Sequence, residues 1–540
     1  MSKDALGNIR TRNTVTAQTD RAREDQVVNN AGGYVFEVAG EDRIKRFLTL
    51  GVQGGTYYVS EKKHAKIEAQ FVLDFARDHG TRLVDLLLEI SEAGRAPKQN
   101  PTLFALAAVF ALGDTEAKVS ARAVFNRIVR TGTMLFQFVA YAEQLRGWGP
   151  SLRKAVASWY ESKDARDLSY QLVKYRQREG WSHRDVLRSA HPKAGGESKR
   201  VLFDWVCGRP SVTESGHAGF IGWTGPFEAA KILSEMTDLK AKKGAYAELV
   251  RSNPGMTWEM LPDEALTIPE TWEALLDAGI PITALIRQLP RLTNLGILTG
   301  ARLTQVTKQL TDTDQLRKGR VHPVKLLYAL KTYTQGHGFQ GRSTWTPNQR
   351  VVDALDAAFY VSFGTVEPAG KRTLIAQDVS GSMSWSGDGI VTAAEGATAM
   401  AMVTAATEPD YEIMGFGSDF RRLDISPRRR LDDNLRTIAN MTFGRTDCSL
   451  PMVWAKQNNL SFDTFVVYTD NETYAGRIQP FEALRQYRQA TGINARLIVV
   501  GMTATSFSIA DPRDPKMLDV AGFDADTPSL ISGFSRGDFG

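Results

Sequence analysis

The chain has 540 residues, of which 42% are hydrophobic and 24% are charged, and it contains only two cysteines. This length predicts two or more domains, and the composition is that of a folded globular protein. Two cysteines argue against a disulfide framework or a cysteine-based zinc site and are typical of a reducing compartment. The net charge of +5 is unevenly spread, because residues 146–209 hold 14 basic and 7 acidic residues. That excess is the charge pattern of a polyanion-binding surface.

The N-terminus begins with a polar stretch, MSKDALGNIRTRNTVTAQTD, which has no apolar core and does not fit a secretory signal. We interpret residues 1–24 as a disordered polar arm. The longest apolar run, LFALAAVFAL at 103–112, is too short to span a bilayer and predicts a buried helix. These features together predict a cytoplasmic protein that has no membrane segment.

From about residue 40 to 365 the apolar pattern is helical. In TRLVDLLLEI (81–90), leucine and isoleucine recur at i, i+3, i+4 and i+7, which places them on one helix face. Similar stripes occur at 66–77, 101–112, 133–146, 270–278 and 323–332. Many helices with short connections favour a bundle or an α-solenoid, although no repeat of fixed length can be read from the sequence.

After Gly370 the pattern changes to short apolar runs that alternate with helical segments. The predicted strands are 373–377, 411–416, 464–469 and 496–501, and the predicted helices between them include 391–406 and 479–490. This alternation predicts right-handed crossovers and a parallel, doubly wound sheet. Ligands of such sheets bind at the carboxyl ends of the strands.

Oxygen-bearing side chains gather after these predicted strands. The motif DVSGSM follows the first strand, GRTDCS lies in a later loop, and an aspartate follows the third strand. The candidate metal ligands are Asp378, Ser380, Ser382, Thr446 and Asp470. Carboxylates and hydroxyls without histidine or cysteine suit a hard divalent cation, with Mg²⁺ preferred and Ca²⁺ or Mn²⁺ as alternatives. If the serines and one carboxylate bind directly, an open position remains for a carboxylate from outside.

Other interpretations of the motif are open. Asp378 and the serines are also residues that cap a following helix. A phosphatase with an aspartyl nucleophile starts from a strand-end aspartate too, but it needs a second acid where this chain has Ser380. A hydrolase using the metal as a Lewis acid needs a base or nucleophile beside the motif, and none is evident. We therefore expect no enzymatic activity.

The motif DVSGSM, with a later threonine loop and a third-loop aspartate, resembles the metal-ion-dependent adhesion site of von Willebrand factor A domains. The resemblance implies that the five residues named above bind the cation directly or through water. Asp447 is not one of the five positions, and we interpret it as a residue behind the ligands. Arg445 stands where a small residue is expected, so it either weakens metal binding or helps to recruit an acidic partner.

The basic segment KYRQREGWSHRDVLRSAHPK (174–193) interleaves cations with the aromatic residues Tyr175 and Trp181. Its basic residues are Lys174, Arg176, Arg178, His183, Arg184, Arg188, His191 and Lys193. Such cations can meet successive phosphates, and the aromatic rings can stack on bases or fill a core. The alternative is a solvated helix face on which Glu179 and Asp185 pair with their neighbours. Composition alone does not decide between the two.

Stretches along most of the chain resemble the Ro ribonucleoprotein autoantigen family, whose helical module is called TROVE. They are VVNNAGGYVFEV (27–38), FLTLGVQGGTYYV (47–59), LRKAVASWY (152–160), KYRQREGWSHRDVLR (174–188), ALDAAFY (354–360), DCSLPMVWA (447–455), YTDNETYAG (468–476) and GMTATSFSIADP (501–512). The resemblance implies a ring of α-helical HEAT-like repeats over residues 25–368. It implies an α/β, Rossmann-like von Willebrand factor A domain over residues 369–540.

The same resemblance implies an RNA-binding scaffold without catalysis. Members hold small noncoding Y RNAs on an outer basic surface and single-stranded 3′ ends of misfolded RNAs in the ring hole. In bacterial members, which this sequence looks like overall, the ring works with the exoribonuclease polynucleotide phosphorylase. Lys174, Arg178 and His191 match the Y RNA positions, and Arg176 and Arg184 are added from charge alone. We expect a monomer, and the alternative function is a metal-dependent module that recruits an acidic protein, with RNA binding incidental.

Overall fold

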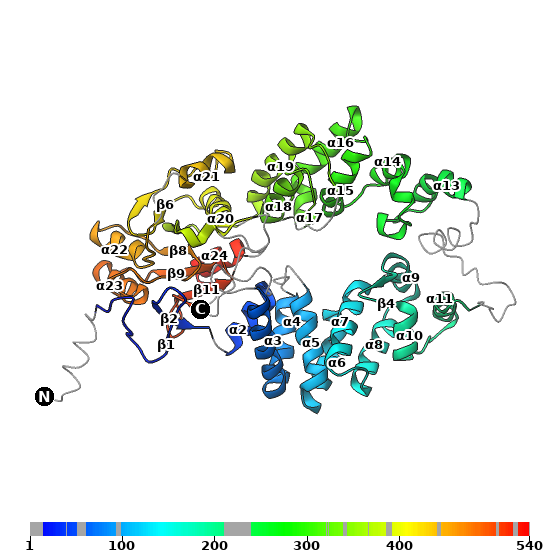
Figure 1. Cartoon of the computed structure of the whole chain (residues 1–540), viewed down its shortest axis with the longest axis horizontal. Helices are drawn as coiled ribbons and strands as arrows, with labels where there is room; N and C mark the ends of the chain where they lie inside the picture. The colour runs from blue at the N-terminus through cyan, green and yellow to red at the C-terminus, as the bar shows by residue number, and fades with distance from the viewer. Residues whose placement is uncertain are drawn as a thin grey trace. The chain divides into compact units, whose positions relative to one another are not determined.

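The computed structural model of the chain falls into two compact units, which are described separately (Figure 1). The sheet unit comprises residues 1–68, 310–341 and 352–540, and the helical unit comprises residues 69–309 and 342–351. The residues that the structure describes are 15–38, 40–50, 61–92, 99–209, 239–319, 321, 323–338, 343–365, 367–384, 391–439, 444–503, 507–521 and 527–538.

The first part of the helical unit is a row of helices in two alternating layers (Figure 1). They are α4 (Gly80–Glu92), α5 (Asn100–Leu112), α6 (Thr115–Ile128), α7 (Gly132–Leu145), α8 (Pro150–Glu161), α9 (Ala165–Lys174), α10 (His183–Ala190) and α11 (Glu197–Cys207). Helix α4 packs on α6, α5 on α7, α6 on α8, α8 on α10, and α9 on α11. Contact between a helix and the next but one is how helical repeats of the HEAT kind stack.

The burial of these helices follows their sequence periodicity. All four apolar residues of the stripe in α4 are buried, from Leu83 to Ile90. Nearly every residue of α5 is buried, which confirms the prediction for the apolar run at 103–112. Helix α6 begins where the carboxylate of Asp114 accepts a hydrogen bond from the amide of Ala117, so this aspartate caps the helix.

The helical unit continues after residue 239. Its later elements are α13 (Leu239–Ser252), η1 (Trp258–Met260), η2 (Ala265–Thr267), α14 (Pro269–Asp277), α15 (Ile282–Asn294) and α16 (Gly300–Leu310). Helix α3 (Glu61–Asp78) runs across the boundary between the units. No described helix in either unit has both the length and the apolar character needed to cross a membrane.

The sheet unit is built on a six-stranded sheet of order β11-β9-β8-β5-β6-β7. The strands are β5 (Thr373–Asp378), β6 (Tyr411–Phe416), β7 (Phe420–Arg422), β8 (Thr464–Thr469), β9 (Arg496–Gly501) and β11 (Met517–Ala521). All neighbours are parallel except β6 and β7, which are antiparallel. The four strands predicted from the sequence pair in parallel, as expected. Strand β7, which the sequence pattern did not indicate, pairs antiparallel with β6 because the short connection from Phe416 to Phe420 cannot form a crossover.

Helices follow the strands as the alternating pattern predicts. They are α20 (Ala393–Thr407), α21 (Leu431–Ala439), α22 (Leu450–Gln457), α23 (Pro480–Thr491) and α24 (Thr527–Arg536). Every residue of β5 and β8 is buried, as expected for central strands covered on both faces. Leu374, Phe465 and Leu497 point into one core with residues of α22 and α23, including Met452 and Leu484.

The described residues of the N-terminal segment belong to the sheet unit. Strands β1 (Gln26–Val28) and β2 (Tyr34–Glu37) pair with each other, and β10 (Phe507–Ser508) adds to β2. After β2, α2 (Gly40–Leu50) contacts β11. Residues 15–24 are therefore not a free arm, whereas 1–14 lie outside the described residues.

Helices from the predicted ring also pack in the sheet unit. They are α17 (Thr313–Lys318), α18 (Pro323–Thr334) and most of α19 (Gln349–Val361). Helix α18 packs on α20, where Lys331 pairs with Glu395 at 2.5 Å. Apolar periodicity shows that a helix forms but not which core receives it, so the sequence did not reveal this boundary.

Candidate metal centre and nucleic-acid interface

The candidate metal residues lie at the carboxyl edge of the central sheet. Asp378 ends β5 and Asp470 directly follows β8, and these two strands are parallel neighbours. Both aspartates are buried, at 0% and 2% exposure. The topology therefore brings the two carboxylates to the same edge, as the strand order predicts.

Hydrogen bonds connect Asp378, Ser380 and Ser382, and Asp470 lies next to this group. The carboxylate of Asp378 accepts from the amide of Ser380 at 2.9 Å and from the hydroxyl of Thr469 at 2.8 Å. The hydroxyls of Ser380 and Ser382 lie 3.1 Å apart, and the Ser382 side chain is near enough to Asp470 to lower the pKa of that carboxyl. These side chains thus form one continuous group of oxygen donors.

The electrostatics of this group favour a cation. Burial raises the pKa of Asp378 to about 7, and the neighbouring charge of Asp470 raises it as well. Burial also raises the pKa of Asp470. No basic side chain among the described residues pairs with either carboxylate, so their charge is not balanced within that part of the protein. The donor set contains only oxygen, and it therefore fits a hard divalent cation.

The fifth candidate ligand, Thr446, lies on the adjoining loop. It is buried, and its carbonyl oxygen accepts hydrogen bonds from the amides of Tyr474 and Ala475 at 3.1 and 3.0 Å. The structure shows no hydrogen bond between its hydroxyl and the other four ligands, all of which are described. Arg445 beside it is exposed. Asp447 accepts hydrogen bonds from Gln18 and from Ser449, at the start of α22.

The N-terminal segment also holds the loops around this site, a role that the sequence pattern did not indicate. We call residues 15–37 the N-terminal clamp. The side chain of Gln18 is fully buried, and its amide group donates to Asp447 at 2.7 Å and to the carbonyl of Ile478 at 3.0 Å. Its oxygen accepts from Thr473 at 2.6 Å and from the amide of Gly476 at 3.0 Å.

Two asparagines of the N-terminal clamp hold the loop that follows Asp470. Asn29 donates to the carbonyl oxygens of residues 471 and 473, and Asn30 donates to Glu472 at 2.6 Å. The one feature of the sequence that points to this loop-holding role is the polar pair Asn29–Asn30 between two short strands. Nothing in the sequence indicates its partner, which lies more than 400 residues away in the chain.

The basic segment forms a small hairpin between α9 and α10 in the helical unit. Strands β3 (Gln177–Arg178) and β4 (Trp181–Ser182) pair directly, and both residues of the turn, Glu179 and Gly180, have positive φ. That is the geometry of a type I′ hairpin turn. Helix α10 begins with a capping box between Ser182 and Asp185, so Asp185 is occupied by its own helix.

The five candidate RNA contacts differ in accessibility. Arg176, Arg178, Arg184 and His191 are exposed. Lys174 is half-buried, where its ammonium donates to the hydroxyl of Tyr170 at 3.1 Å. A guanidinium N–H of Arg176 donates to the carbonyl of Met260 at 3.3 Å, which restrains this side chain.

The charges of the hairpin are largely unpaired. Glu179 lies 3.9 Å from Arg178, which is a weak contact between exposed groups. No carboxylate among the described residues forms an ion pair with Arg184, Arg188 or Lys193. The interpretation of a face neutralised by Glu179 and Asp185 therefore accounts for little of the positive charge.

His183 does not join these cations. It is 2% exposed, its Nδ1 lies 2.8 Å from the hydroxyl of Tyr160, and burial lowers its pKa to about 3. It stacks on Trp159 and contacts Phe136. This histidine is a neutral core residue that fixes the start of α10.

Both halves of the chain match family models. Residues 372–535 match the Ro60 vWA domain, and residues 27–208 and 244–332 match the TROVE domain. The chain is 40% identical over 529 residues to the RNA-binding protein RO60 of Deinococcus radiodurans, covering 96% of this chain and 97% of the relative. The chain belongs to the Ro60 family.

Other relatives of this Ro60-family chain agree. It is 36% identical over 592 residues to the RNA-binding protein RO60 of Caenorhabditis elegans, covering 97% of this chain and 92% of the relative. The crystal structure of the Deinococcus radiodurans RO (RSR) protein matches with a TM-score of 0.71 at 39% identity, covering 92% of this chain and 99% of that one. The predicted family and fold class are confirmed.

Proposed function

We propose that this Ro60-family chain is a non-catalytic RNA-binding scaffold in RNA quality control and decay. It holds small noncoding Y RNA on the outer basic surface that includes the β3–β4 hairpin. It accepts single-stranded 3′ ends of misfolded RNA in the hole of the helical ring. The observation that carries the proposal is the set of exposed cations on this hairpin and α10, which have few ion-pair partners among the described residues. That both curated relatives are named RNA-binding proteins supports it.

The physical basis is counterion release. Each Lys or Arg that neutralises an RNA phosphate releases condensed counterions, so affinity falls steeply with salt. Arg178 and Arg184 project from a rigid hairpin and a capped helix, which fixes their spacing. His191, at the end of α10, is exposed in a left-handed conformation with φ of 52° and can donate to an RNA oxygen.

The test is a salt titration of binding to a small structured Y-like RNA. The double variant Lys174→Ala with Arg178→Ala loses most of its affinity for this RNA. The slope of log affinity against log salt falls by ~0.7–0.9 for each phosphate that is no longer neutralised. The charge-matched control is Arg77→Ala with Arg127→Ala, two exposed arginines elsewhere in the helical unit. Equal binding by the two double variants would contradict the placement of RNA on the hairpin.

As partners, we propose an exoribonuclease such as polynucleotide phosphorylase, which degrades the RNA that the scaffold presents. The proposed working form is a cytoplasmic monomer. Co-precipitation of the exoribonuclease with and without ribonuclease treatment tests the proposed partnership. A partner tethered through Y RNA is lost after treatment, and a partner held by direct protein contact is retained.

We propose in addition that the sheet unit binds a divalent cation, Mg²⁺ in preference to Ca²⁺ or Mn²⁺. Asp378, Ser380, Ser382, Thr446 and Asp470 would hold the ion directly or through water. The observation in favour is the pair of buried, unbalanced carboxylates. A bound cation supplies a coordination position for an acidic side chain of a partner protein, which is the second candidate function.

Thermal unfolding with Mg²⁺ and with chelator tests the metal site. Mg²⁺ at 100 times its dissociation constant stabilises the wild type by about 2.7 kcal/mol, because it binds only the folded state. Asp378→Asn loses this response, yet in chelator it is at least as stable as the wild type, since one of two buried like charges is gone. Asp419→Asn, an exposed aspartate of the same unit, keeps the response. Equal stabilisation of Asp378→Asn and the wild type would contradict the ligand assignment.

A further inference from the structure

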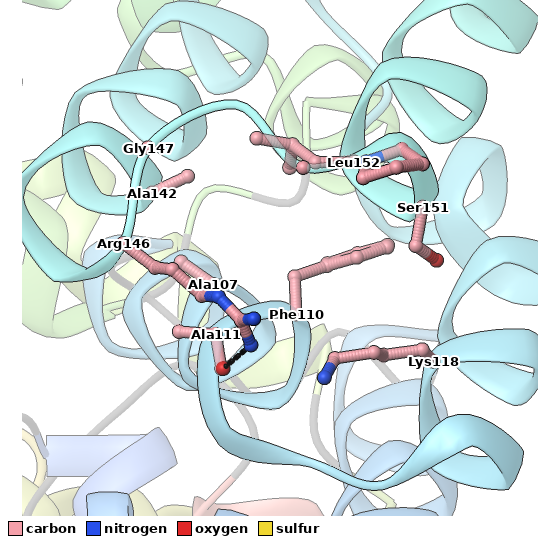
Figure 2. Close-up of a pocket in the computed structure, with 11 residues that line it drawn as sticks. Ala107, Phe110, Ala111, Lys118, Ala142, Arg146, Gly147, Ser151 and Leu152 are labelled. Carbon is pink, nitrogen blue, oxygen red and sulfur yellow. Dashed lines mark hydrogen bonds between the residues drawn. The ribbon is translucent and has the colours of Figure 1, made fainter.

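A small cavity in the helical unit lies where α5, α6, α7 and α8 meet (Figure 2). Its volume is about 120 Å³, well above the ~10–15 Å³ that a single water molecule needs. Its lining combines apolar residues such as Phe110 and Leu152 with two cations, Lys118 and Arg146. Figure 2 shows the Lys118 ammonium and the Arg146 guanidinium directed toward one another below the Phe110 ring.

The two cations are not balanced by a neighbouring carboxylate. Burial lowers the pKa of Lys118, the positive charge of Arg146 lowers it further, and only Asp114 opposes them. The carboxylate of Asp114 is already engaged as the cap of α6. One guanidinium N–H of Arg146 donates to the carbonyl of Ala111 at 2.8 Å. Within the described part of the chain, neither cation forms an ion pair.

The start of α8 adds unused hydrogen-bond donors to the same cavity. Its N-cap is Gly149, which has no side chain to cap the helix, and Pro150 follows. The amides of Ser151 and Leu152 have no partner among the described residues. The buried hydroxyl of Ser151, which also lines the cavity, has none there either. Free amides at a helix N-terminus favour an anion.

The cavity adjoins the hairpin that carries the proposed RNA contacts. Residues 146 and 147 line it, and the next residue, Trp148, packs on Trp181 of β4 with ring centroids 6.0 Å apart. The hairpin strands β3 and β4 also pack on α7, whose C-terminal part lines the cavity through Ala142. An RNA strand bound to the hairpin would therefore pass close to the cavity.

We propose that this cavity binds one phosphate group of the RNA, held by Lys118, Arg146 and the first turn of α8. The identification of RNA as the natural source of this phosphate rests on the proposed RNA-binding function. The chemistry that the cavity recognises is a phosphate oxyanion, supplied either by the RNA backbone or by a terminal phosphate. Phe110 and Leu152 form an apolar wall of the cavity beside these cations.

The test has an arm that does not depend on RNA. Lysines are labelled with an amine-reactive reagent while inorganic phosphate is titrated, and the modified sites are read by mass spectrometry. Phosphate protects Lys118 in the wild type but not in Arg146→Gln, and it does not protect Lys154, an exposed lysine of α8 outside the cavity. Equal labelling of Lys118 with and without phosphate would overturn the proposal even if RNA binds.

The RNA arm identifies the source of the phosphate. Lys118→Gln lowers the slope of log affinity against log salt by ~0.7–0.9, Lys118→Arg retains the wild-type slope, and Lys154→Gln has a smaller effect than Lys118→Gln. With a terminal phosphate as ligand, removing the 5′- or 3′-phosphate abolishes the difference between wild type and Lys118→Gln. With a backbone phosphate as ligand, replacing that one phosphate by a neutral methylphosphonate abolishes the difference between wild type and Lys118→Gln. Equal effects of Lys118→Gln and Lys154→Gln would overturn the site, whereas no RNA binding by wild type would overturn the function alone.

Discussion

At the scale of single residues, burial decides what a titratable side chain does in this protein. Asp378 and His183 are both fully enclosed, but their pKa values move in opposite directions, because burial disfavours the charged form of each. For Asp378 the penalty favours a bound cation. For His183 it favours a neutral ring in the core, which removes this residue from the basic surface that the sequence predicts.

The pKa of His183 predicts a pH dependence of stability. The value of about 3 in the folded protein lies below the unfolded value of ~6.5, so the unfolded state takes up the proton first as pH falls. The contribution is fully present above pH ~6.5 and is lost progressively toward pH 3. Between pH 7 and pH 5 this histidine lowers the free energy of unfolding by about 2 kcal/mol.

Chemical denaturation at pH 7 and pH 5 measures this contribution. The variant His183→Asn is less stable than wild type at pH 7, because it lacks the hydrogen bond with Tyr160 and the packing of the ring. The difference between the two proteins then shrinks by about 2 kcal/mol at pH 5. A difference that stays constant over this range would show that His183 is not buried as a neutral ring.

Site residues that follow a motif in the sequence were easier to predict than residues whose role depends on how distant segments pack around them. Asp378, Ser380, Ser382 and Asp470 follow buried strands, and the structure brings all four together. Their metal role stays a prediction. The accessibility of Lys174 and the burial of His183 depend on helices that pack from elsewhere in the chain, and local spacing carries no information on them.

At the scale of elements, the N-terminal clamp is the feature that links distant parts of the sequence most closely. It lies against the loop of residues 471–476, which follows the candidate metal residue Asp470, and Gln18, Asn29 and Asn30 supply the hydrogen bonds. The strands of the sheet were predicted closely because their apolar runs are continuous. The clamp was not, because its strands are short and its partners are remote.

Gly33 tests the fit of the clamp. A Cβ atom added at this position would lie 1.8 Å from the carbonyl oxygen of Thr473. Gly33→Ala therefore displaces the clamp and lowers the free energy of unfolding of the sheet unit by at least ~1–3 kcal/mol, the usual cost of overpacking. The displaced loop also weakens the stabilisation by Mg²⁺.

Thermal unfolding with and without Mg²⁺ reads out both effects. The matched control is Gly196→Ala in the helical unit, where an added Cβ meets nothing within 4 Å. If Gly33→Ala unfolds like this control, the clamp is not seated on the loop. If it is destabilised but responds normally to Mg²⁺, the clamp supports the fold without positioning the metal loop.

At the scale of the whole molecule, the sequence predicts the two kinds of architecture and their order but not which helices pack in each compact unit. The compact sheet unit includes the described residues between 15 and 68 and those between 310 and 341. The sequence assigns residues 25–368 to the helical ring and residues 1–24 to a separate arm. Hydrophobic periodicity specifies which face of a helix is buried, and the partner is fixed only by tertiary packing. Ring closure by the helical repeats stays a prediction.

RNA binding through the hairpin and α10 in the helical unit is the central claim. Crosslinking and sequencing of RNA that copurifies with the native protein tests it most directly, beside the double variant Lys174→Ala with Arg178→Ala and the charge-matched control Arg77→Ala with Arg127→Ala. We predict a discrete small RNA with the wild type and the control, and its absence from the hairpin variant. The same RNA recovered equally from all three proteins, or no enriched RNA from any of them, would contradict the claim.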